Sequence, residues 1–307
     1  MNTINIIQEI FAALNIALPI TIAYHYFPEF TLSPLGITMF SALAGAYFMF
    51  FAYTTGKKQF NGLLHAPSGE YLELLHKEII KCGICPTKIR LKYGYTDDKL
   101  ALTSINTIVI DQMLWKNVDN DPEALKAKSI IKTHVLPTLS PDVIAWHDKI
   151  NKLFTPETQN FIFRHELGHV VHNFSIKYYL ISGFTIMFAT AVGLLVARTA
   201  INSFDGIVAL TLGMLAGILV DSFAPYALNI FFKAPAERNA DLFAARFSSQ
   251  EEIEAAAHFF EQYDICADEF KSKIGIPIQR STIIFNGYPS GKTRAEYLRK
   301  IIAKYNK

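Results

Sequence analysis

Three residues within one short segment have the types and spacing to hold a metal ion and to move a proton. His165 and His169 stand four positions apart in the run F-R-H-E-L-G-H-V-V-H, which covers residues 163–172. On an α-helix that spacing puts both imidazoles on one face, where they can bind one zinc ion. Glu166 lies beside the first histidine. Its carboxylate can take a proton from a metal-bound water and later give it to a leaving amine. The segment therefore predicts metal-assisted hydrolysis.

The residues around this segment favour the helix that the spacing requires. Thr155 is suited to be its N-cap, Pro156 suits the first helical position, and Glu157 suits the positive end of the helix dipole. The apolar residues Phe161, Phe163 and Leu167 alternate with the polar ligand face. A plain core helix with hydrogen-bonded histidines is the alternative interpretation of the same pattern.

A second pair of residues can complete the metal site. A zinc site that acts on water uses three protein ligands, and the run A-E-R-N-A-D at residues 236–241 offers two carboxylates four positions apart. Glu237 can be the third ligand. Asp241 can accept the second N–H of a ligand histidine and fix its tautomer. The alternative is that the two carboxylates form an exposed pair on a helix surface, where they repel each other mildly.

The composition indicates that these motifs belong to a membrane protein. Residues of the set AVILMFWYC make up 51% of the 307 residues and charged residues only 18%, against about 25% in soluble domains. This composition excludes a disordered or coiled-coil chain. A net charge of +2 without a basic stripe argues against a nucleic-acid partner. Three cysteines are too few for a disulfide scaffold.

Four stretches are long and apolar enough to cross a bilayer, which needs about 20 residues per helix. They run approximately over Ile6–Phe27, Leu35–Tyr53, Tyr179–Ala197 and Gly206–Phe232. The expected organisation is a transmembrane hairpin (1–56), a first domain part with the histidine helix (57–176), a second hairpin (177–232) and a second domain part with Glu237 (233–307). Buried core helices of a soluble protein are the alternative.

The basic residues predict how the spans are oriented, because short cytoplasmic loops are enriched in lysine and arginine. Lysine and arginine flank the soluble parts at Lys57, Lys58, Lys177, Lys233 and Arg238, whereas the two hairpin links contain only Arg198. Both soluble parts and both termini are therefore expected on the cytoplasmic side, with the lipid bilayer as a partner.

The two motifs and the hairpin between them resemble the M48 zinc metallopeptidases, and the two hairpins are most similar to the HtpX-like membrane proteases. The resemblance implies a zincin-like α+β fold, mainly α, with one Zn²⁺ per chain in a bacterial inner membrane. It implies endopeptidase action on membrane or misfolded proteins. By this resemblance His165, His169 and Glu237 bind zinc, Glu166 is the general base, and Asp241 supports a ligand histidine.

Two further positions are compared with the family through the run G-Y-P-S-G-K-T-R at residues 287–294. The family often has His-Pro here and an arginine six residues after that histidine. Pro289 and Arg294 match, but Tyr288 stands in place of the histidine, which is thought to hold the oxyanion. A tyrosine hydroxyl can also donate to an oxyanion, so Tyr288 and Arg294 are predicted to take part in catalysis. An ordinary loop tyrosine is the alternative.

The sequence also predicts where a substrate would bind. Lys88–Tyr93 and Thr103–Asp111 have strand patterns, and in zincins an edge strand beside the zinc helix pairs with an extended substrate. Residues Thr107–Ile110 are the predicted edge strand, by strand addition; a plain buried strand is the alternative.

Other functions stay open at this stage. A CAAX-type prenyl-peptide protease would use the same site, and a zinc-binding sensor or scaffold without catalysis would keep the metal alone. Cys82 and Cys85 have the spacing of half a zinc knuckle but lack a second pair. No role is assigned to the segment Trp115–Phe154, and the substrate and oligomeric state are not determined by the sequence.

Overall fold

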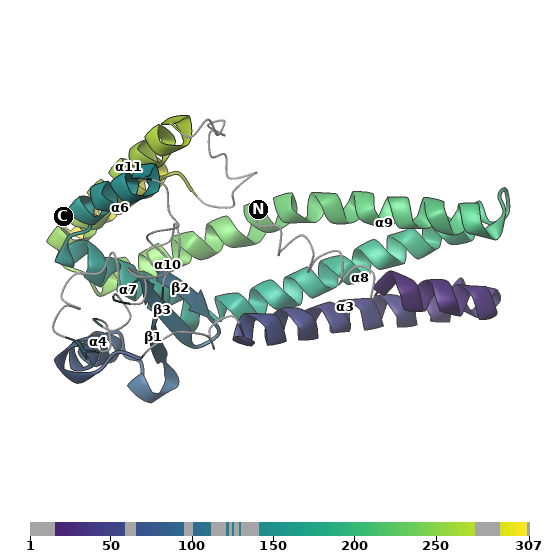
Figure 1. The fold of residues 1–307 in the computed structure, drawn as a ribbon, viewed down its shortest axis with the longest axis horizontal. Helices are drawn as coiled ribbons and strands as arrows, with labels where there is room; N and C mark the ends of the chain where they lie inside the picture. Colours follow the sequence, from purple (N-terminus) through teal and green to yellow (C-terminus); the bar gives the residue numbers. More distant parts are fainter. Residues whose placement is uncertain are drawn as a thin grey trace. The chain divides into compact units, whose positions relative to one another are not determined.

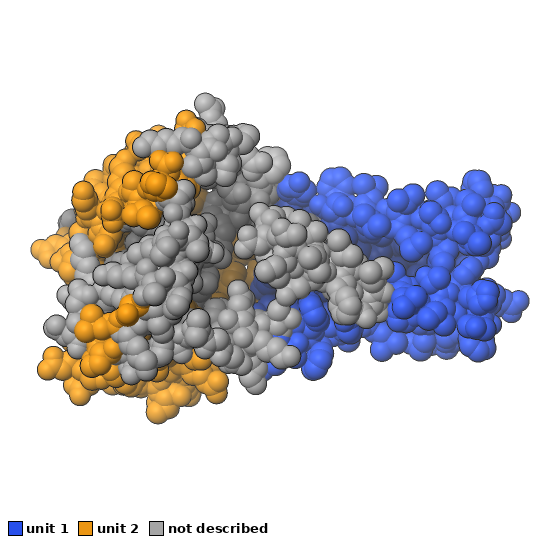
Figure 2. Space-filling model, viewed as in Figure 1, with its two compact units in different colours: residues 1–55, 176–228 blue, residues 56–175, 229–307 orange. Residues whose placement is uncertain are grey.

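The computed structural model of the 307-residue chain describes residues 16–58, 66–94, 101–111, 121–122, 125, 129, 141–273 and 289–305. The chain divides into two compact units, shown in different colours in Figure 2. Unit 1 comprises residues 1–55 and 176–228, and unit 2 comprises residues 56–175 and 229–307. Each unit is therefore built from two separate stretches of the chain.

Unit 1 is helical throughout its described part (Figure 1). It contains the helical residues 16–26, α2 (Pro28–Thr31), α3 (Pro34–Lys58, ending just beyond the unit), α8 (Phe174–Ala200) and α9 (Gly206–Leu228). Among the described residues, three helical stretches are long and apolar enough to cross a membrane: Pro34–Thr54, Phe174–Ala200 and Gly206–Phe247. The predicted first span, Ile6–Phe27, lies partly outside the described residues, so four spans remain a prediction.

Glycines let α8 and α9 approach closely, since small residues recur four positions apart at Ala189 and Gly193 and at Gly213 and Gly217. A Cβ added to Gly193 would lie 2.8 Å from the carbonyl oxygen of Gly213, and one added to Gly213 would lie 2.4 Å from that of Gly193. In the link between the two helices, the Asp205 side chain accepts hydrogen bonds from the backbone N–H groups of Ile207 and Val208. This N-cap starts α9 directly after the turn.

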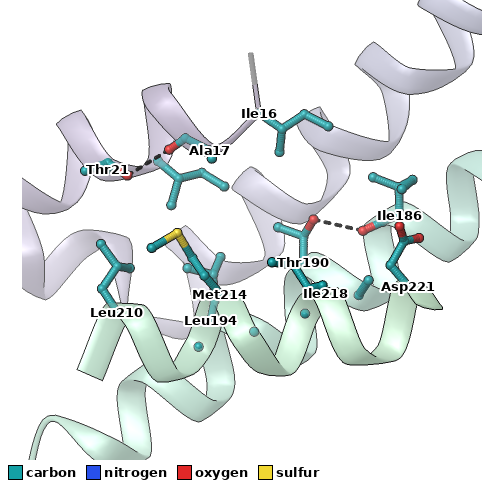
Figure 3. A pocket seen from close by; sticks show the side chains of 15 residues that line it. Ile16, Ala17, Thr21, Ile186, Thr190, Leu194, Leu210, Met214, Ile218 and Asp221 are labelled. Atoms are coloured by element: carbon teal, nitrogen blue, oxygen red, sulfur yellow. Dashed lines mark hydrogen bonds between the residues drawn. The ribbon is translucent and has the colours of Figure 1, made fainter. Parts of the chain in front are cut away.

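Unit 1 also contains an open pocket of about 240 Å³, lined by residues of 16–21, α8 and α9. Figure 3 shows Leu210 at one end of it and Asp221 at the other. Asp221 is the only ionisable residue among those that line the pocket, and the others are mostly apolar. None of the predicted metal ligands belongs to unit 1, so this pocket is separate from the predicted metal site.

Unit 2 combines several helices and a small three-stranded sheet around one core (Figure 1). Before the α8–α9 hairpin it contains α4 (Gly69–Lys81), a 3₁₀ turn (Pro86–Lys88), β1 (Arg90–Gly94), β2 (Ala101–Ser104), β3 (Thr107–Asp111), α6 (Pro141–Leu153) and α7 (Pro156–Val171). After it come a π-helical turn (Asn229–Lys233), α10 (Ala234–Arg246), α11 (Gln250–Lys273) and α13 (Gly291–Tyr305). Helix α7 packs against α10, α11 and β2, and Phe161, Phe163 and Leu167 on α7 are fully buried or nearly so.

The sheet corrects the prediction about the edge strand. The described strands lie in the order β1-β3-β2, with β3 parallel to β1 and antiparallel to β2. Thr107–Ile110 therefore belongs to the central strand, and the edge on the α7 side is β2. The uninterrupted apolar run Ile108-Val109-Ile110 is typical of a strand covered on both faces, and all three side chains are buried. A turn at Ile105–Asn106 divides the predicted strand Thr103–Asp111 into two.

Helix α7 begins as the sequence predicts. Thr155 has extended backbone angles, its hydroxyl oxygen accepts a hydrogen bond from the N–H of Thr158, and Pro156 occupies the first turn with Glu157. The cap satisfies one of the backbone donors left free at a helix start. The helix that begins here contains both histidines, and its 3.6-residue repeat places them on one face.

Arg164 anchors α7 to α4 and α11 through buried contacts. Its side chain is 1% exposed and is among the largest buried side chains of the described chain. The guanidinium donates to Glu78 of α4 at 2.8 Å, to Glu252 of α11 at 2.6 Å and to the Ser248 hydroxyl at 2.8 Å. Because Arg164 immediately precedes His165, these contacts fix the helix at the position of the first predicted ligand.

Replacing Arg164 by Met is expected to lower the free energy of unfolding by about 3 kcal/mol, because it leaves two carboxylates without their partner. Burial raises the pKa of Glu252, but hydrogen bonds from Arg164 and the backbone of Ser249 outweigh it and lower that pKa below its usual value. A lowered carboxyl pKa adds stability above about pH 4.3, and that stability is lost as the pH falls through the folded-state pKa. The difference between variant and wild type should therefore shrink below about pH 4.

Thermal unfolding in detergent between pH 3 and pH 8 checks this expectation. Arg299→Met is the matched control, because Arg299 also contacts two glutamates, Glu254 and Glu261, but its side chain is 38% exposed. That exposed network is worth about 1 kcal/mol or less. Equal losses of stability in the two variants would contradict the role given to Arg164.

Candidate metal centre

Three buried side chains from two helices bring their donor atoms together in unit 2. Nε2 of His165 lies 3.1 Å from Nε2 of His169, and each of these nitrogens lies 3.3 Å from an oxygen of Glu237. The three residues are between 4% and 7% exposed. Within the part of the chain that the structure describes, they form the only group of three or more such side chains able to hold a metal ion.

The spacing of these donors fits a small divalent ion. A tetrahedral zinc ion with bonds of about 2.1 Å requires ligand atoms about 3.4 Å apart. The two histidine nitrogens lie 3.1 Å apart. Nε2 of His165 lies 3.3 Å from Oε2 of Glu237, and Nε2 of His169 lies 3.3 Å from Oε1, the other oxygen of the same carboxylate. Two imidazole nitrogens and one carboxylate oxygen also form a donor set that suits zinc. His165, His169 and Glu237 would therefore hold the ion and leave one tetrahedral position open.

Close contact between α7 and α10 brings the ligands of the two helices together. Gly168, one residue before His169, faces Ala240, one residue before Asp241. A Cβ added to Gly168 would lie 3.0 Å from the Cα of Ala240 and 3.2 Å from its carbonyl oxygen. A larger residue at position 168 would therefore push α10 away and move Glu237 from the histidines. The close approach of Ala240 therefore explains why a glycine stands between the two histidines, at position 168.

Asp241 holds the first histidine from behind. Its Oδ1 lies 2.8 Å from Nδ1 of His165. The Nδ1–H group donates a hydrogen bond to this carboxylate, and the lone pair of Nε2 is then available to bind a metal. Arg294 of α13 in turn donates to both oxygens of Asp241, at 2.9 Å and 2.6 Å. Its guanidinium also lies 3.6 Å from the ring centre of Phe260. Asp241 therefore holds the Nδ1–H group of His165, and Arg294 in turn holds Asp241.

The carboxylates of Asp241 and Glu237 make the space between the three ligand side chains favourable for a positive charge. Burial alone would lower the pKa of His165, but the carboxylates of Asp241 and Glu237 overcome it and raise this pKa to about 10. Burial likewise opposes ionisation of Glu237, yet its contacts with His165 and His169 keep its pKa well below the usual value. The same electrostatic attraction acts on a metal cation in place of a proton.

Glu166 points its carboxylate to the edge strand of the sheet. The hydroxyl of Thr103 on β2 donates a hydrogen bond to Oε2 of Glu166 and also lies 3.4 Å from the backbone oxygen of that residue. Glu166 itself is 9% exposed. Thr103 was not among the predicted site residues. No local sequence signal could have found it, because the contact joins residues 63 positions apart.

The other residues considered in the sequence lie outside the group of three ligand candidates. Arg294 contacts Asp241, and its guanidinium lies 3.5 Å from Nδ1 of His165. Tyr288 lies outside the described residues. His172 caps the end of α7 and stacks edge-on with Phe243, away from the three ligand atoms. Cys82 and Cys85 are free thiols, at the end of α4 and in the following loop.

Comparison with known proteins agrees with this arrangement. The model of the family described as peptidase family M48 matches residues 113–302, more than half of the chain and a range that includes all three ligand candidates. No curated protein and no solved structure matches the chain. With a family match of this extent around a buried cluster of two histidines and a glutamate, the chain belongs to peptidase family M48.

Proposed function

We propose that this protein is a membrane-integrated zinc metalloendopeptidase that hydrolyses peptide bonds of membrane or misfolded proteins on the cytoplasmic side. The observation that carries the proposal is the buried cluster of His165, His169 and Glu237, with Glu166 on the same helix, in a chain of a peptidase family. Three apolar helical stretches support integration in a membrane. The distribution of lysine and arginine supports the cytoplasmic side.

The mechanism assigns one task to each side chain. A zinc ion, when bound, supplies the Lewis acidity that polarises a carbonyl and acidifies water. His165 and His169 present neutral Nε2 atoms to it, and Glu237 adds a negative charge. Glu166, adjacent to His165, accepts a proton from the attacking water and delivers it to the leaving nitrogen. Asp241 keeps the Nδ1 proton of His165 in place, which prevents the wrong tautomer.

The sheet provides a place for the peptide. Among the described strands β2 is paired on one side only, with β3. An extended peptide can add to the free side of such a strand through backbone hydrogen bonds, which are independent of side-chain identity. Thr103 of β2 contacts Glu166, so a peptide held there would lie near the general base. Binding through the backbone suits an enzyme that acts on unfolded segments.

A cleavage assay with removal and return of metal tests this function. The full chain, purified in detergent, is expected to cleave an unfolded protein such as casein, to lose that activity with a chelator and to regain it with added zinc. Bound zinc should be close to one per chain. Cleavage that persists after the metal has been removed would contradict the mechanism, and absence of bound zinc would contradict the site. One zinc without cleavage of any tested protein would favour a sensor or scaffold.

A further inference from the structure

We propose that Thr103 is a positioning residue for the general base: its hydroxyl holds the carboxylate of Glu166 in the orientation that proton transfer requires. This inference rests on the proposed function, because it concerns the residue that moves the proton. It assigns to the edge strand a task besides peptide binding. The strand would also set the geometry of the catalytic carboxylate.

The first observation is that this hydrogen bond has no substitute nearby. Among the residues that the structure describes, Thr103 is the only one whose side chain hydrogen-bonds to the carboxylate of Glu166. The neighbouring histidines and carboxylates bond to one another instead. A glutamate side chain has three rotatable bonds, so without this contact its carboxylate is free to change rotamer. Thr103 removes that freedom at the general base.

The second observation is that Thr103 is itself held firmly. Its register partner on β3 is Ile108, which is fully buried, and Leu91 of β1 is paired with Ile108 on the other side. Side chains at directly paired positions lie on the same face of a sheet. Thr103 therefore projects from the face that carries the core. Its β-branched side chain has few rotamers, which fixes the direction of the hydroxyl.

The position on β2 links peptide binding to the base. A peptide that adds to the free side of β2 bonds to the backbone of the strand whose side chain holds Glu166. Ordering of β2 by the peptide would then also order the carboxylate. Hydrogen bonds to charged groups contribute about 1.5–3 kcal/mol. Loss of the hydrogen bond from Thr103 to Glu166 is therefore expected to affect the rate of the chemical step more than the binding of the peptide.

Three variants of the full chain test the proposal, each measured for kcat and KM on an unfolded protein substrate and for bound zinc. Thr103→Val keeps the shape and removes the hydroxyl, so kcat should fall about 10- to 100-fold, with KM within about twofold and zinc content unchanged. Thr103→Ser keeps the hydroxyl and should regain most of kcat. Thr107→Val is the matched control, because Thr107 lies on β3 and on the opposite face from Ile108.

A binding measurement provides a readout that needs no turnover. A small peptidyl hydroxamate coordinates a metal through its two oxygens, and its acidic proton requires an acceptor such as Glu166. Its dissociation constant, measured on zinc-loaded protein, should rise about tenfold or more in Thr103→Val. The constant should stay at the wild-type value in Thr107→Val.

Several results would overturn the proposal. These are a wild-type kcat in Thr103→Val, a change in KM or zinc content with kcat unaltered, or a Thr103→Ser variant as slow as Thr103→Val. Failure of the proposed function gives a different pattern, in which the wild type cleaves no substrate. In that case equal hydroxamate binding by wild type and Thr103→Val still rejects the role of Thr103, whereas weaker binding by Thr103→Val supports it.

Discussion

Replacing Glu166 by Gln is expected to reduce peptide cleavage by about 10²- to 10⁴-fold, the range that a general acid–base residue contributes. The amide has nearly the shape of the carboxylate and can still accept the hydrogen bond from Thr103. It cannot accept a proton from water at neutral pH. Because Glu166 is not among the three metal-binding candidates, the variant should still bind about one zinc per chain.

The measurement compares initial rates of cleavage with bound zinc in the same detergent-purified samples. Glu296→Gln is the matched control, because Glu296 is an exposed residue of α13 and should leave both quantities unchanged. Cleavage at the wild-type rate by the Glu166→Gln variant would exclude Glu166 as the general base. Loss of zinc together with activity would instead assign Glu166 to the metal site itself.

Replacing Glu237 by Ala is expected to weaken zinc binding by more than about 100-fold. Loss of a partner behind a ligand already costs about 10- to 100-fold in metal affinity, and Glu237 lies 3.3 Å from both histidine nitrogens. The variant also removes a buried negative charge that attracts a cation. Two histidines alone are left, which do not complete a three-ligand site.

Equilibrium dialysis against buffered zinc checks this prediction, with Glu296→Ala as the exposed control. The Glu237→Ala variant should lose zinc at concentrations where wild type and control remain loaded, and its peptide cleavage should fall with its zinc content. A tightly bound zinc in the Glu237→Ala variant would mean that the third ligand is another residue. Asp241 would then be the next candidate, because its carboxylate is the other acid beside His165.

The local features of the chain were predictable from the sequence because their causes act within a few residues. The helical repeat places His165 beside His169, and the cap at Thr155 and Pro156 follows from the backbone donors at a helix start. The apolar stretches that form α3, α8 and α9 are evident from length and composition. The pairing of Glu237 with the histidines was also predictable, although only as a hypothesis about ligand chemistry.

The tertiary structure decided the features that depend on contacts between distant residues. The order β1-β3-β2 makes β2 the edge strand, and a strand pattern reports burial but does not name the neighbour. Thr103 meets Glu166 across 63 positions and Arg164 meets Glu252 across 88. Such pairs depend on how α7 packs between the sheet and α11. The sequence by itself determined which residues are the candidates for the chemistry, and only the packing of helices and strands decided which side chains lie against them.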